Sequence, residues 1–291
     1  MNIIDGRKIS EEILGKLHEE ILQKSLSPRL AIIQIGSEEP SNVYISMKRQ
    51  ASEKIGVLTD IYHYEGKDIE SILKLIDDLN KDIKVNGIIL QLPTPGIQSR
   101  EILNNIAPEK DVDGLTMYSL GHIWHNSNNR GEFIGATPKA IIATLEQIAS
   151  TEGVQLKDLL IGKNVVIINH NILIGRPLAG IFLNHNATVS ILHEFSQDIN
   201  QSLKVADIIV TATGKRIIDS SNSANLKEGV IIIDSGYSLV GGKSIGDVEL
   251  DSVKDIASYI TPVPGGVGPI AVAMLMKNTV LAFINQRVAQ A

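Results

Sequence analysis

The sequence contains no cysteine, and this absence excludes disulfide bonds and metal sites built on thiolates. It also lacks an excess of positive charge, because 27 lysines and arginines against 33 aspartates and glutamates give a net charge of −6. The basic residues are scattered along the chain, whereas nucleic acid binds a concentrated positive face. We therefore expect no nucleic-acid partner.

No apolar stretch reaches the roughly 18 uncharged residues that a membrane span needs. The run PIAVAMLMKNTVLAFI comes closest, but Lys277 and Asn278 interrupt it, so we interpret it as a buried or domain-bridging helix. The first residues, MNIIDGRKIS, lack the basic start, apolar middle and small-residue cleavage site of a secretory signal. These features predict a cytoplasmic protein without a membrane partner.

The residues that are present describe a globular protein. With 43% apolar and 21% charged residues, the chain has the ordinary composition of soluble domains. Its 291 residues suffice for one large domain or two medium-sized ones, each able to bury a core, and we favour two.

Short runs of valine, isoleucine and leucine alternate with helical patterns, which indicates parallel strands joined by crossover helices. The middle runs are apolar at both parities, as expected for strands that are covered on two faces. A helix is predicted over 68–79, because its apolar residues fall on one stripe. The candidate strands are 30–35, 57–64, 87–91, 165–169, 187–192, 206–211 and 230–234.

This alternation breaks between residues 92 and 140, where the loop-forming sequences LPTPG, APEKDVDG and GATPKA follow one another. We expect the junction of two α/β domains here, and a second junction at the TPVPGGVGP loop. The predicted fold class is therefore α/β with two domains. Residues 1–136 plus 269–291 form the first predicted domain, and residues 137–268 form the second.

A lysine lies in the apolar stripe of the helix that is predicted after IGSEEP, with Ser41 or Asn42 as its cap. A lysine there can lay its stem along apolar surface while its amine reaches water. If the amine is buried instead, desolvation lowers its pKa, and the lysine can transfer protons near neutrality. Spacing alone does not decide between these interpretations. The residues that share this helix face are Tyr44, Lys48, Ala51 and Ile55.

Other polar residues follow predicted strands or lie in loops. Gln91 ends an apolar strand, where ligands of open α/β sheets collect, and its amide can bind a ligand, a neighbour or the loop backbone. Asp111 and Asp113 lie in a loop, where aspartates most often bond nearby backbone; contact of one with a ligand is the alternative. His122 and His125 lie in a loop-like segment, and the sequence identifies no carboxylate as a partner for them, so we interpret both as structural and predict no metal site.

Motifs along nearly the whole chain resemble the bifunctional methylenetetrahydrofolate dehydrogenase/methenyltetrahydrofolate cyclohydrolases, the FolD family. The ten-residue string ITPVPGGVGP is highly specific, whereas a single glycine-rich loop would not be. The other motifs that carry the resemblance are DGRKIS, Tyr44-x-x-x-Lys48, GIILQLPTP, PEKDVDG, ATPKA, IGRPLA, NATVSILH, ADIIVTATG and IIIDSG.

The resemblance implies a one-carbon enzyme with folate in a cleft between two α/β domains, the second a Rossmann-like doubly wound sheet. It would oxidise 5,10-methylenetetrahydrofolate with NAD(P)+ and hydrolyse the methenyl product to 10-formyltetrahydrofolate, and relatives are usually homodimers. Lys48 would be the general acid/base, Gln91 would orient it, Tyr44 would pack on the folate, and Asp113 would bond the pterin. A lysine beside the cationic methenyl substrate should be biased towards its neutral form.

The resemblance also implies wider binding sets. Folate would be held by the catalytic residues together with Leu92, Pro93, Pro264 and Gly265. The dinucleotide would be held by Thr137, Asn169, His170, Asn171, Gly175, Arg176, Glu194, Thr213, Gly214, Ser235, Tyr237 and Gly268.

The chain departs from the family pattern at the strand-to-helix turn, where the family has Gly-Arg-Ser and this chain has Asn169, His170 and Asn171. The family arginine pairs with the 2′-phosphate of NADP, and the serine that follows the next strand is Glu194 here. An acidic residue at this place suits the ribose 2′-hydroxyl of NAD and repels a 2′-phosphate. We therefore predict a preference for NAD over NADP; a solvated strand-end charge is the alternative for Glu194.

Further departures bear on the dehydrogenase activity. Pro-Cys-Thr-Pro and Gly-Pro-Met-Thr of the family become GATP at 135–138 and GPIA at 268–271. If the backbone at Asn169 approaches the pyrophosphate closely, its side chain lowers affinity, although asparagine tolerates left-handed dihedrals. We predict that the turn still holds a dinucleotide. The alternatives are a cyclohydrolase with a degraded dinucleotide site, a folate-binding protein without turnover, and an unrelated NAD-dependent dehydrogenase.

Overall fold

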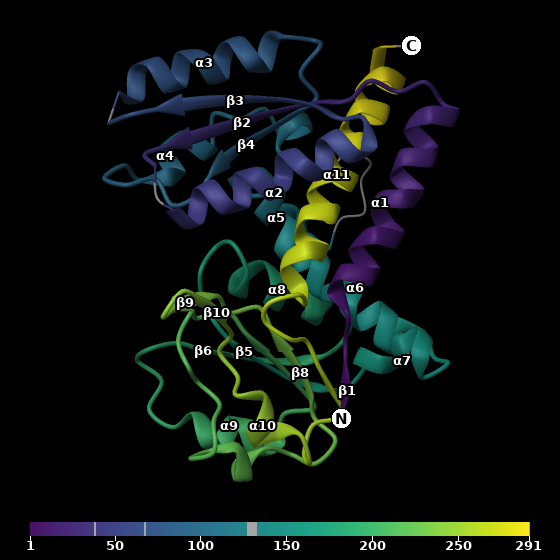
Figure 1. Cartoon of the computed structure of the whole chain (residues 1–291), viewed down its shortest axis with the longest axis vertical. Helices are drawn as coiled ribbons and strands as arrows, with labels where there is room; N and C mark the ends of the chain where they lie inside the picture. The colour runs from purple at the N-terminus through teal and green to yellow at the C-terminus, as the bar shows by residue number, and fades with distance from the viewer. Residues whose placement is uncertain (38, 67, 127–132, 291) are drawn as a thin grey trace. The chain divides into compact units, whose positions relative to one another are not determined.

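The computed structural model describes residues 1–290 apart from residues 38, 67 and 127–132. The chain forms two compact units, each with its own parallel sheet (Figure 1). The six-stranded unit comprises Met1–Ile9 and Thr137–Ala271, and the three-stranded unit comprises Ser10–Ala136 and Val272–Ala291. The α/β class predicted from the sequence is confirmed.

The junction between residues 136 and 137 coincides with the predicted one. The first nine residues, however, belong to the six-stranded unit and not to the predicted first domain. The reason is that strand β1 (Asn2–Ile3) pairs in parallel with β11 (Tyr259–Ile260). The other junction lies after Ala271 rather than after residue 268, inside helix α11 (Val267–Gln290).

The three-stranded unit is built on β2 (Arg29–Ile35), β3 (Leu58–Tyr64) and β4 (Gly87–Gln91), in the order β3-β2-β4. Helix α2 (Glu39–Ile55) leads from β2 to β3, and helix α3 (Ile69–Lys81) leads from β3 to β4 across β2. These two crossovers run in opposite directions, so right-handed connections place the helices on opposite faces of the sheet. Figure 1 shows this arrangement.

The core of this unit joins the sheet to helices α1 (Gly6–Gln23), α2 and α11. Leu17 of α1, Ile55 of α2 and Met276 of α11 are all buried in it. Helix α11 has a mean hydropathy of 1.7 and is long enough to cross a membrane, but 67% of its apolar stretch is buried, as in the core helix of a soluble protein. The remaining elements of the unit are α4 (Ser99–Leu103), η1 (Pro108–Lys110) and α5 (Met117–His125).

The six-stranded unit has the strand order β1-β11-β8-β7-β5-β6. The chain runs outward from β5 to β6 and then returns past β5 to β7, so the strand order reverses between β5 and β7. In doubly wound sheets, ligands bind at the carboxyl ends of the strands on either side of such a reversal. The bounds are β5 (Asn164–Ile168), α8 (Gly175–Asn184), β6 (Thr188–Leu192), α9 (Ile199–Val205), β7 (Ile208–Thr211) and β8 (Ile231–Asp234).

Shorter elements complete the six-stranded unit. Strands β9 and β10 lie between β8 and β11 in the sequence and form an antiparallel hairpin. Their bounds, with those of the remaining helices, are β9 (Ser238–Val240), β10 (Lys243–Ile245), α6 (Ala136–Thr151), α7 (Leu156–Leu160), η2 (Ser223–Asn225) and α10 (Leu250–Val253).

Several local predictions are wrong. Helix α2 begins at Glu39, so Ser41 and Asn42 lie in its first turn and do not cap it. His122 and His125 lie in helix α5 and not in a loop; Thr116 caps this helix by accepting a hydrogen bond from Ser119. The helix predicted over 68–79 is confirmed as α3, and its cap is Asp68.

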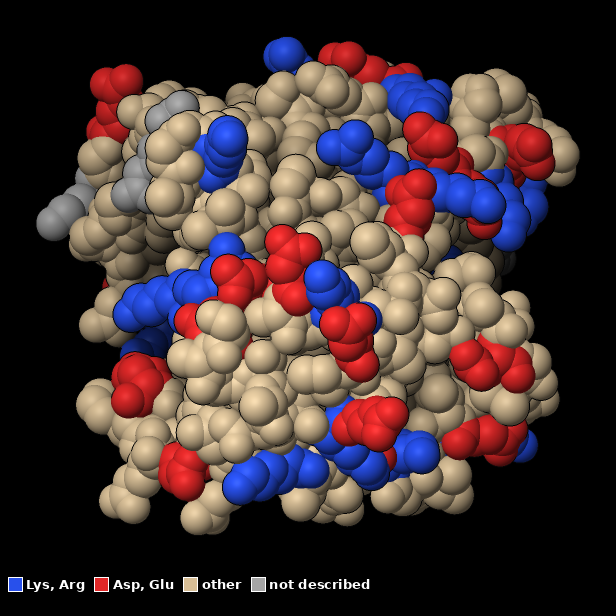
Figure 2. Space-filling model, turned by 60° about the horizontal axis from the view of Figure 1, so that its bottom comes forward, with Lys and Arg blue, Asp and Glu red and all other residues tan. Residues whose placement is uncertain are grey.

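Charged side chains of both signs lie near one another on the face drawn in Figure 2. Ion pairs among the described residues include Lys24 with Glu20 and Lys227 with Asp207, both at 2.6 Å. The mixed charge follows from the scattered distribution of basic and acidic residues along the sequence.

Candidate active site

The lysine selected from the sequence meets the glutamine selected from the sequence. Lys48, half-buried on α2, donates a hydrogen bond of 2.8 Å from Nζ to Oε1 of Gln91, the last residue of β4. Gln91 is 9% exposed, and its Nε2 donates to the carbonyl oxygen of Leu92 at 2.7 Å. This second bond turns the amide oxygen towards the amine, so the glutamine is held as an acceptor for Lys48.

Burial changes the acid–base properties of Lys48 and of Asp113. Desolvation lowers the pKa of Lys48, while the negative charge of Asp113 opposes that decrease. Desolvation likewise raises the pKa of Asp113, and the charge of Lys48 opposes that increase. The low-dielectric surroundings therefore favour the neutral form of each group, which lets a lysine accept and donate protons closer to neutral pH.

The two loop aspartates, Asp111 and Asp113, make different interactions. Asp111 is 1% exposed; its Oδ1 accepts the N–H of Leu115 at 3.1 Å, and its Oδ2 accepts the N–H of Thr116 at 2.9 Å and the hydroxyl of Ser119 at 2.6 Å. It thus satisfies the start of helix α5, as an aspartate in a turn does. The backbone interpretation is correct for Asp111, whereas Asp113 is the aspartate that interacts electrostatically with Lys48.

One amide beside this site was not selected from the sequence. Gln34 is paired in register with Gln91 on the neighbouring strand and is 6% exposed. Its Nε2 donates to Oδ1 of Asn42 at 2.7 Å, which ties the first turn of α2 to the sheet. The available signal was a single polar residue near the carboxyl end of the apolar strand 30–35, whereas Gln91 was selected by its position at the very end of its strand.

The other residues assigned to folate lie in two places. Tyr44 is half-buried on α2, one turn before Lys48, and Leu92 and Pro93 follow β4 directly. Pro264 and Gly265 belong to the six-stranded unit, in the loop after β11. Gly265 has a φ of +103°, a backbone conformation that requires glycine.

At the turn after β5, Asn169 bonds the backbone of its own loop. Its Oδ1 accepts the N–H groups of Asn171 at 2.9 Å and Gly175 at 3.2 Å, and its Nδ2 donates to the carbonyl oxygen of Ala212 at 2.6 Å. Because Ala212 follows β7, this side chain joins the two loops at the reversal of strand order. Asn169 has a negative φ, so the replaced glycine is not needed here for backbone freedom.

The turn that leads into helix α8 is bonded in the same way, although the N-cap of the helix, Ile174, provides no side-chain cap. Oδ1 of Asn171 accepts the N–H groups of Leu173 at 3.1 Å and Ile174 at 2.9 Å. Gly175 lies so close to the strand that an added Cβ would be 2.0 Å from the carbonyl oxygen of Asn169. A glycine at this place is what allows a helix to pack closely on a nucleotide-binding strand.

His170 and Glu194 lie together at the ends of the neighbouring strands β5 and β6. Nδ1 of His170 is 3.7 Å from Oε2 of Glu194, and the side chains are 46% and 61% exposed. The imidazole ring of His193 packs on that of His170, with centroids 5.1 Å apart. Arg176 donates from Nε to the carbonyl oxygen of His170 at 3.0 Å.

Most of the remaining residues assigned to the dinucleotide follow β7 or β8. The N–H of Ser235 donates to the carbonyl oxygen of Thr211 at 2.8 Å, which joins the two strand ends. Gly214 has a φ of +71°. Tyr237 also follows β8, whereas Thr137 and Gly268 lie in the first turns of α6 and α11. The strand reversal and the close approach at Gly175 both fit a dinucleotide.

Within the described residues, no group of three or more histidine, aspartate or glutamate side chains could hold a metal ion. The groups described above offer proton transfer at Lys48 and ligand binding at the strand ends. The burial of Lys48 and its bond to Gln91 are the observations on which that statement depends.

Comparisons with known proteins agree with this geometry. Residues 4–113 match the family model described as tetrahydrofolate dehydrogenase/cyclohydrolase, catalytic domain, and residues 135–287 match that of its NAD(P)-binding domain. The bifunctional protein FolD of Lactobacillus acidophilus is 39% identical over 284 residues, which cover 96% of this chain and 95% of that protein.

Solved structures give the same result. The bifunctional FolD methylenetetrahydrofolate dehydrogenase/cyclohydrolase of Campylobacter jejuni has a TM-score of 0.89 and 35% identity, covering 98% of this chain and 99% of its own. The FolD of Trypanosoma brucei, solved with an NADP cofactor and an inhibitor, has a TM-score of 0.88 and 30% identity, covering 99% and 98%.

Proposed function

The chain belongs to the tetrahydrofolate dehydrogenase/cyclohydrolase family, and on that premise we propose that Lys48 transfers the proton in its hydrolytic reaction. The enzyme is bifunctional: it oxidises 5,10-methylenetetrahydrofolate to the methenyl form with NAD(P)+, and it hydrolyses the methenyl form to 10-formyltetrahydrofolate. The proposal assigns this chain's residues to the two reactions.

The hydrolysis needs a base that takes a proton from water as the water adds to the methenyl carbon. Lys48 supports this role because burial lowers the pKa of its amine and Gln91 holds Nζ at 2.8 Å. In its neutral form the amine has a lone pair that can accept the proton. The bond between Lys48 and Gln91 is the single observation that carries the assignment.

The roles of the neighbouring residues follow from their places. We assign Tyr44 to packing on the folate rings, since it lies one helical turn before Lys48, and Asp113 to the pterin. Leu92 and Pro93 directly follow Gln91 and would line the same strand end. Pro264 and Gly265 complete the folate set in this proposal.

The dinucleotide is assigned to the six-stranded unit, where NAD(P)+, when bound, supplies the acceptor of the hydride. The loops after β5, β7 and β8 would hold it, through Gly175, Arg176, Gly214, Ser235 and Tyr237. Thr137 and Gly268 are assigned to it as well, together with Asn169, Asn171 and Thr213.

We further propose that the enzyme prefers NAD to NADP. The support is the distance of 3.7 Å between His170 and Glu194, the two residues that replace the arginine and the serine of the family pattern. A carboxylate at this strand end accepts hydrogen bonds from a ribose diol and repels a 2′-phosphate. A permanently charged arginine, which would attract the phosphate, is missing.

A specific observation also favours a second candidate, a cyclohydrolase with little dehydrogenase activity. Asn169 and Asn171 already accept the hydrogen bonds of four N–H groups around the start of α8. These groups are the usual ligands of a pyrophosphate in doubly wound sheets. A dinucleotide would have to displace these bonds or bind beside them.

Absorbance assays on the purified enzyme test the proposals together. Loss of methenyltetrahydrofolate measures hydrolysis, and its formation from the methylene substrate with NAD+ or NADP+, side by side, measures oxidation. We expect hydrolysis, and oxidation that is faster with NAD+. Hydrolysis without oxidation by either dinucleotide would favour the second candidate, and faster oxidation with NADP+ would refute the cofactor preference. We also propose that the enzyme is a homodimer and that it is cytoplasmic. Light scattering after size exclusion tests the first of these, and cell fractionation tests the second.

A further inference from the structure

Two buried carboxylates lie next to the loops assigned to the dinucleotide, and sequence analysis selected neither. Asp234 ends β8 and is 2% exposed, and Asp247 follows β10 and is fully buried. Aspartates are almost never so deeply buried unless their oxygens have partners. The partners of these two therefore indicate what they do.

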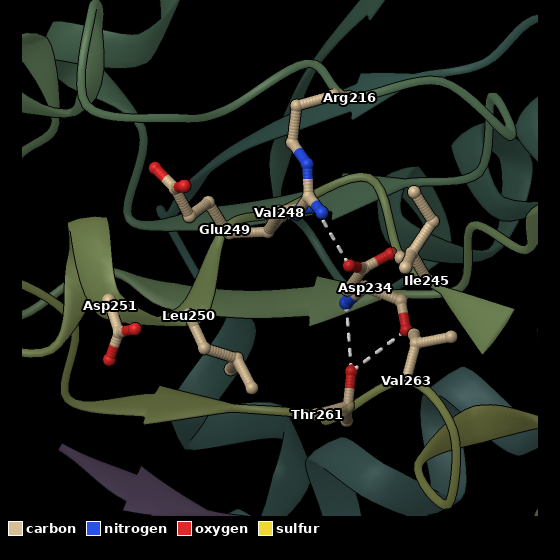
Figure 3. Close-up of a pocket in the computed structure, with 10 residues that line it drawn as sticks. Arg216, Asp234, Ile245, Val248, Glu249, Leu250, Asp251, Thr261 and Val263 are labelled. Carbon is tan, nitrogen blue, oxygen red and sulfur yellow. Dashed lines mark hydrogen bonds between the residues drawn. The ribbon is translucent and has the colours of Figure 1, made fainter. Parts of the chain in front are cut away.

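Asp234 accepts hydrogen bonds on both carboxylate oxygens. Its Oδ1 accepts the N–H groups of Gly236 at 2.9 Å and Asp247 at 3.1 Å, and its Oδ2 accepts the N–H of Val248 at 2.9 Å. Figure 3 shows the bond to Val248, and it also shows Thr261 bonded to the main chain of Asp234. Asp234 thus joins the chain after β8 to the chain after β10.

Asp247 uses only one carboxylate oxygen in this way. Its Oδ2 accepts both the N–H of Thr213 at 2.6 Å and the hydroxyl of Thr213 at 2.9 Å. Its Oδ1 is buried without a hydrogen-bond partner among the described residues. Its carbonyl oxygen accepts the N–H of Ile217 at 2.8 Å, so the loop after β7 is held at both ends by this one residue.

Two glycines make room for the two carboxylates. An added Cβ on Gly236 would lie 1.9 Å from Oδ1 of Asp247, and one on Gly246 would lie 2.1 Å from Oδ2 of Asp234. Neither position could carry a larger residue without displacing a carboxylate. Each acid therefore needs a glycine from the other segment: Asp247 packs against Gly236 of the D-x-G sequence at 234–236, and Asp234 packs against Gly246 of the G-D sequence at 246–247.

From these contacts we propose that Asp234 and Asp247 are positioning residues of the dinucleotide site. Asp247 holds the loop after β7 through Thr213, and Asp234 holds both Asp247 and the turn after β8 through Gly236. This inference rests on the proposed function, which assigns Thr213, Gly214 and Ser235 to the cofactor. Neither carboxylate touches the cofactor in this proposal; each fixes the backbone that does.

Burial also changes the acid–base properties of the two carboxylates. Desolvation, together with the smaller effect of the charge of Asp247, raises the pKa of Asp234 to about 6 against the opposing effect of three backbone hydrogen bonds. Desolvation also raises the pKa of Asp247, against the opposing effect of hydrogen bonds from Thr213 and from the backbone N–H groups of Gly214 and Lys215. Maintaining two like charges in this interior is costly. The other charged groups around the cavity beside Asp234 are Arg216, Glu249 and Asp251.

Amide substitutions give the test its direction. In Asp247→Asn, the amide oxygen can still accept both bonds from Thr213, and the NH2 group replaces the oxygen that has no partner. In Asp234→Asn, an NH2 group must face either the N–H groups at Oδ1 or the N–H of Val248. We therefore expect Asp247→Asn to keep cofactor affinity and Asp234→Asn to weaken it.

The experiment is calorimetric titration of each full-length variant with NAD+ and with NADP+. Leaving a buried N–H without a partner predicts about a tenfold increase in Kd for Asp234→Asn and for Asp247→Ala. Asp247→Asn should stay within about twofold of the wild type, because its hydrogen bonds persist. Asp251→Asn is the matched control, since this exposed aspartate borders the same cavity, and it should leave Kd unchanged.

A second readout separates positioning from general unfolding. Hydrolysis of methenyltetrahydrofolate without dinucleotide depends on Lys48 in the three-stranded unit and should be unchanged in all four variants. Equal Kd values for Asp247→Ala and the wild type would overturn the inference while leaving the proposed function intact. An equal loss of dinucleotide affinity in Asp234→Asn and Asp247→Asn would overturn the inference too, because it would indicate that binding needs the negative charges and not the hydrogen bonds. A wild type that binds neither dinucleotide would refute the dehydrogenase assignment and the inference with it.

Discussion

The two strand ends that carry the proposed chemistry use their polar side chains in opposite ways. In the three-stranded unit, Nζ of Lys48 donates one hydrogen bond, to Gln91, among the described residues. The remaining hydrogen-bonding capacity of the amine is available to a substrate or to water. In the six-stranded unit, the amide oxygens of Asn169 and Asn171 each accept two N–H groups of their own turn, and Nδ2 of Asn169 bonds the carbonyl oxygen of Ala212.

This difference indicates how to distinguish a reactive polar residue from one that supports the fold. A group with unused hydrogen-bonding capacity in a desolvated place is energetically unfavourable unless a ligand satisfies it. Lys48 fits that description, and Asn169 does not. Asp111 and Asp113 differ within one loop too, because Asp111 accepts three hydrogen bonds at the start of α5, whereas Asp113 interacts electrostatically with the lysine.

The largest effect that would test this comparison is expected for Lys48→Met. General acid–base groups contribute about 10²- to 10⁴-fold, so hydrolysis should fall by that order while the fold is retained. Methenyltetrahydrofolate decay measures the rate, and circular dichroism measures the fold. Lys54→Met, an exposed change on the same helix, is the control and should have wild-type activity. Unaltered hydrolysis in Lys48→Met would remove this lysine from the mechanism.

The second prediction concerns the exposed end of the turn in the six-stranded unit. The double change His170→Arg with Glu194→Ser removes a repulsive carboxylate and adds a donor for a 2′-phosphate. A charge-assisted hydrogen bond of about 1.5–3 kcal/mol corresponds to roughly 10- to 100-fold in affinity, so the ratio of kcat/KM for NADP to that for NAD should rise by this order.

Glu228→Ser is the control for this change, because Glu228 is exposed in the same unit but precedes β8 rather than following β6. Its cofactor preference should equal that of the wild type. If the double variant does not use NADP better, charge at this strand end does not set the preference.

Sequence reasoning predicted well where the physics is local. Strand 87–91 was placed at its observed bounds, because an apolar run between loop signals has few alternative structures. Lys48 and Gln91 were selected by helix spacing and strand-end position, together with the resemblance. Strands β1 and β11 were missed because two residues carry no periodicity, and they form only by pairing with distant strands.

What the sequence did not reveal depends on contacts between distant residues. Asp234 and Asp247 lie 13 positions apart, and their proximity depends on a hairpin that was not predicted. Helix α5 was missed because Ser119 and Gly121 interrupt its apolar pattern, whereas Asp111 and Thr116 stabilise its start. Such tertiary hydrogen bonds override local propensity.

The third prediction tests whether the saturated turn limits dinucleotide binding. Asn169→Gly frees the N–H groups of Asn171 and Gly175, and one additional neutral hydrogen bond of about 1 kcal/mol predicts roughly fivefold tighter binding. Asn169→Asp keeps both acceptor bonds but places a negative charge beside the pyrophosphate, so it should bind more weakly. Titration calorimetry measures both. Weaker binding by the glycine variant would mean that Asn169 prepares the turn for the cofactor instead of competing with it.

The smallest expected effect is a displacement of a pH profile by Asp113→Asn. Hydrolysis by a neutral lysine increases with pH through the pKa of Lys48 and then levels off. Asp113 opposes the desolvation that lowers this pKa, so removing its charge leaves desolvation unopposed and moves the midpoint to lower pH. The profile is measured by methenyltetrahydrofolate decay, corrected for the uncatalysed reaction at each pH. Asp78→Asn, an exposed change on α3, should leave the midpoint in place. A midpoint that moves to higher pH would show that Asp113 does not stabilise the charged lysine, and the contrast between the two strand ends would then rest on Gln91 alone.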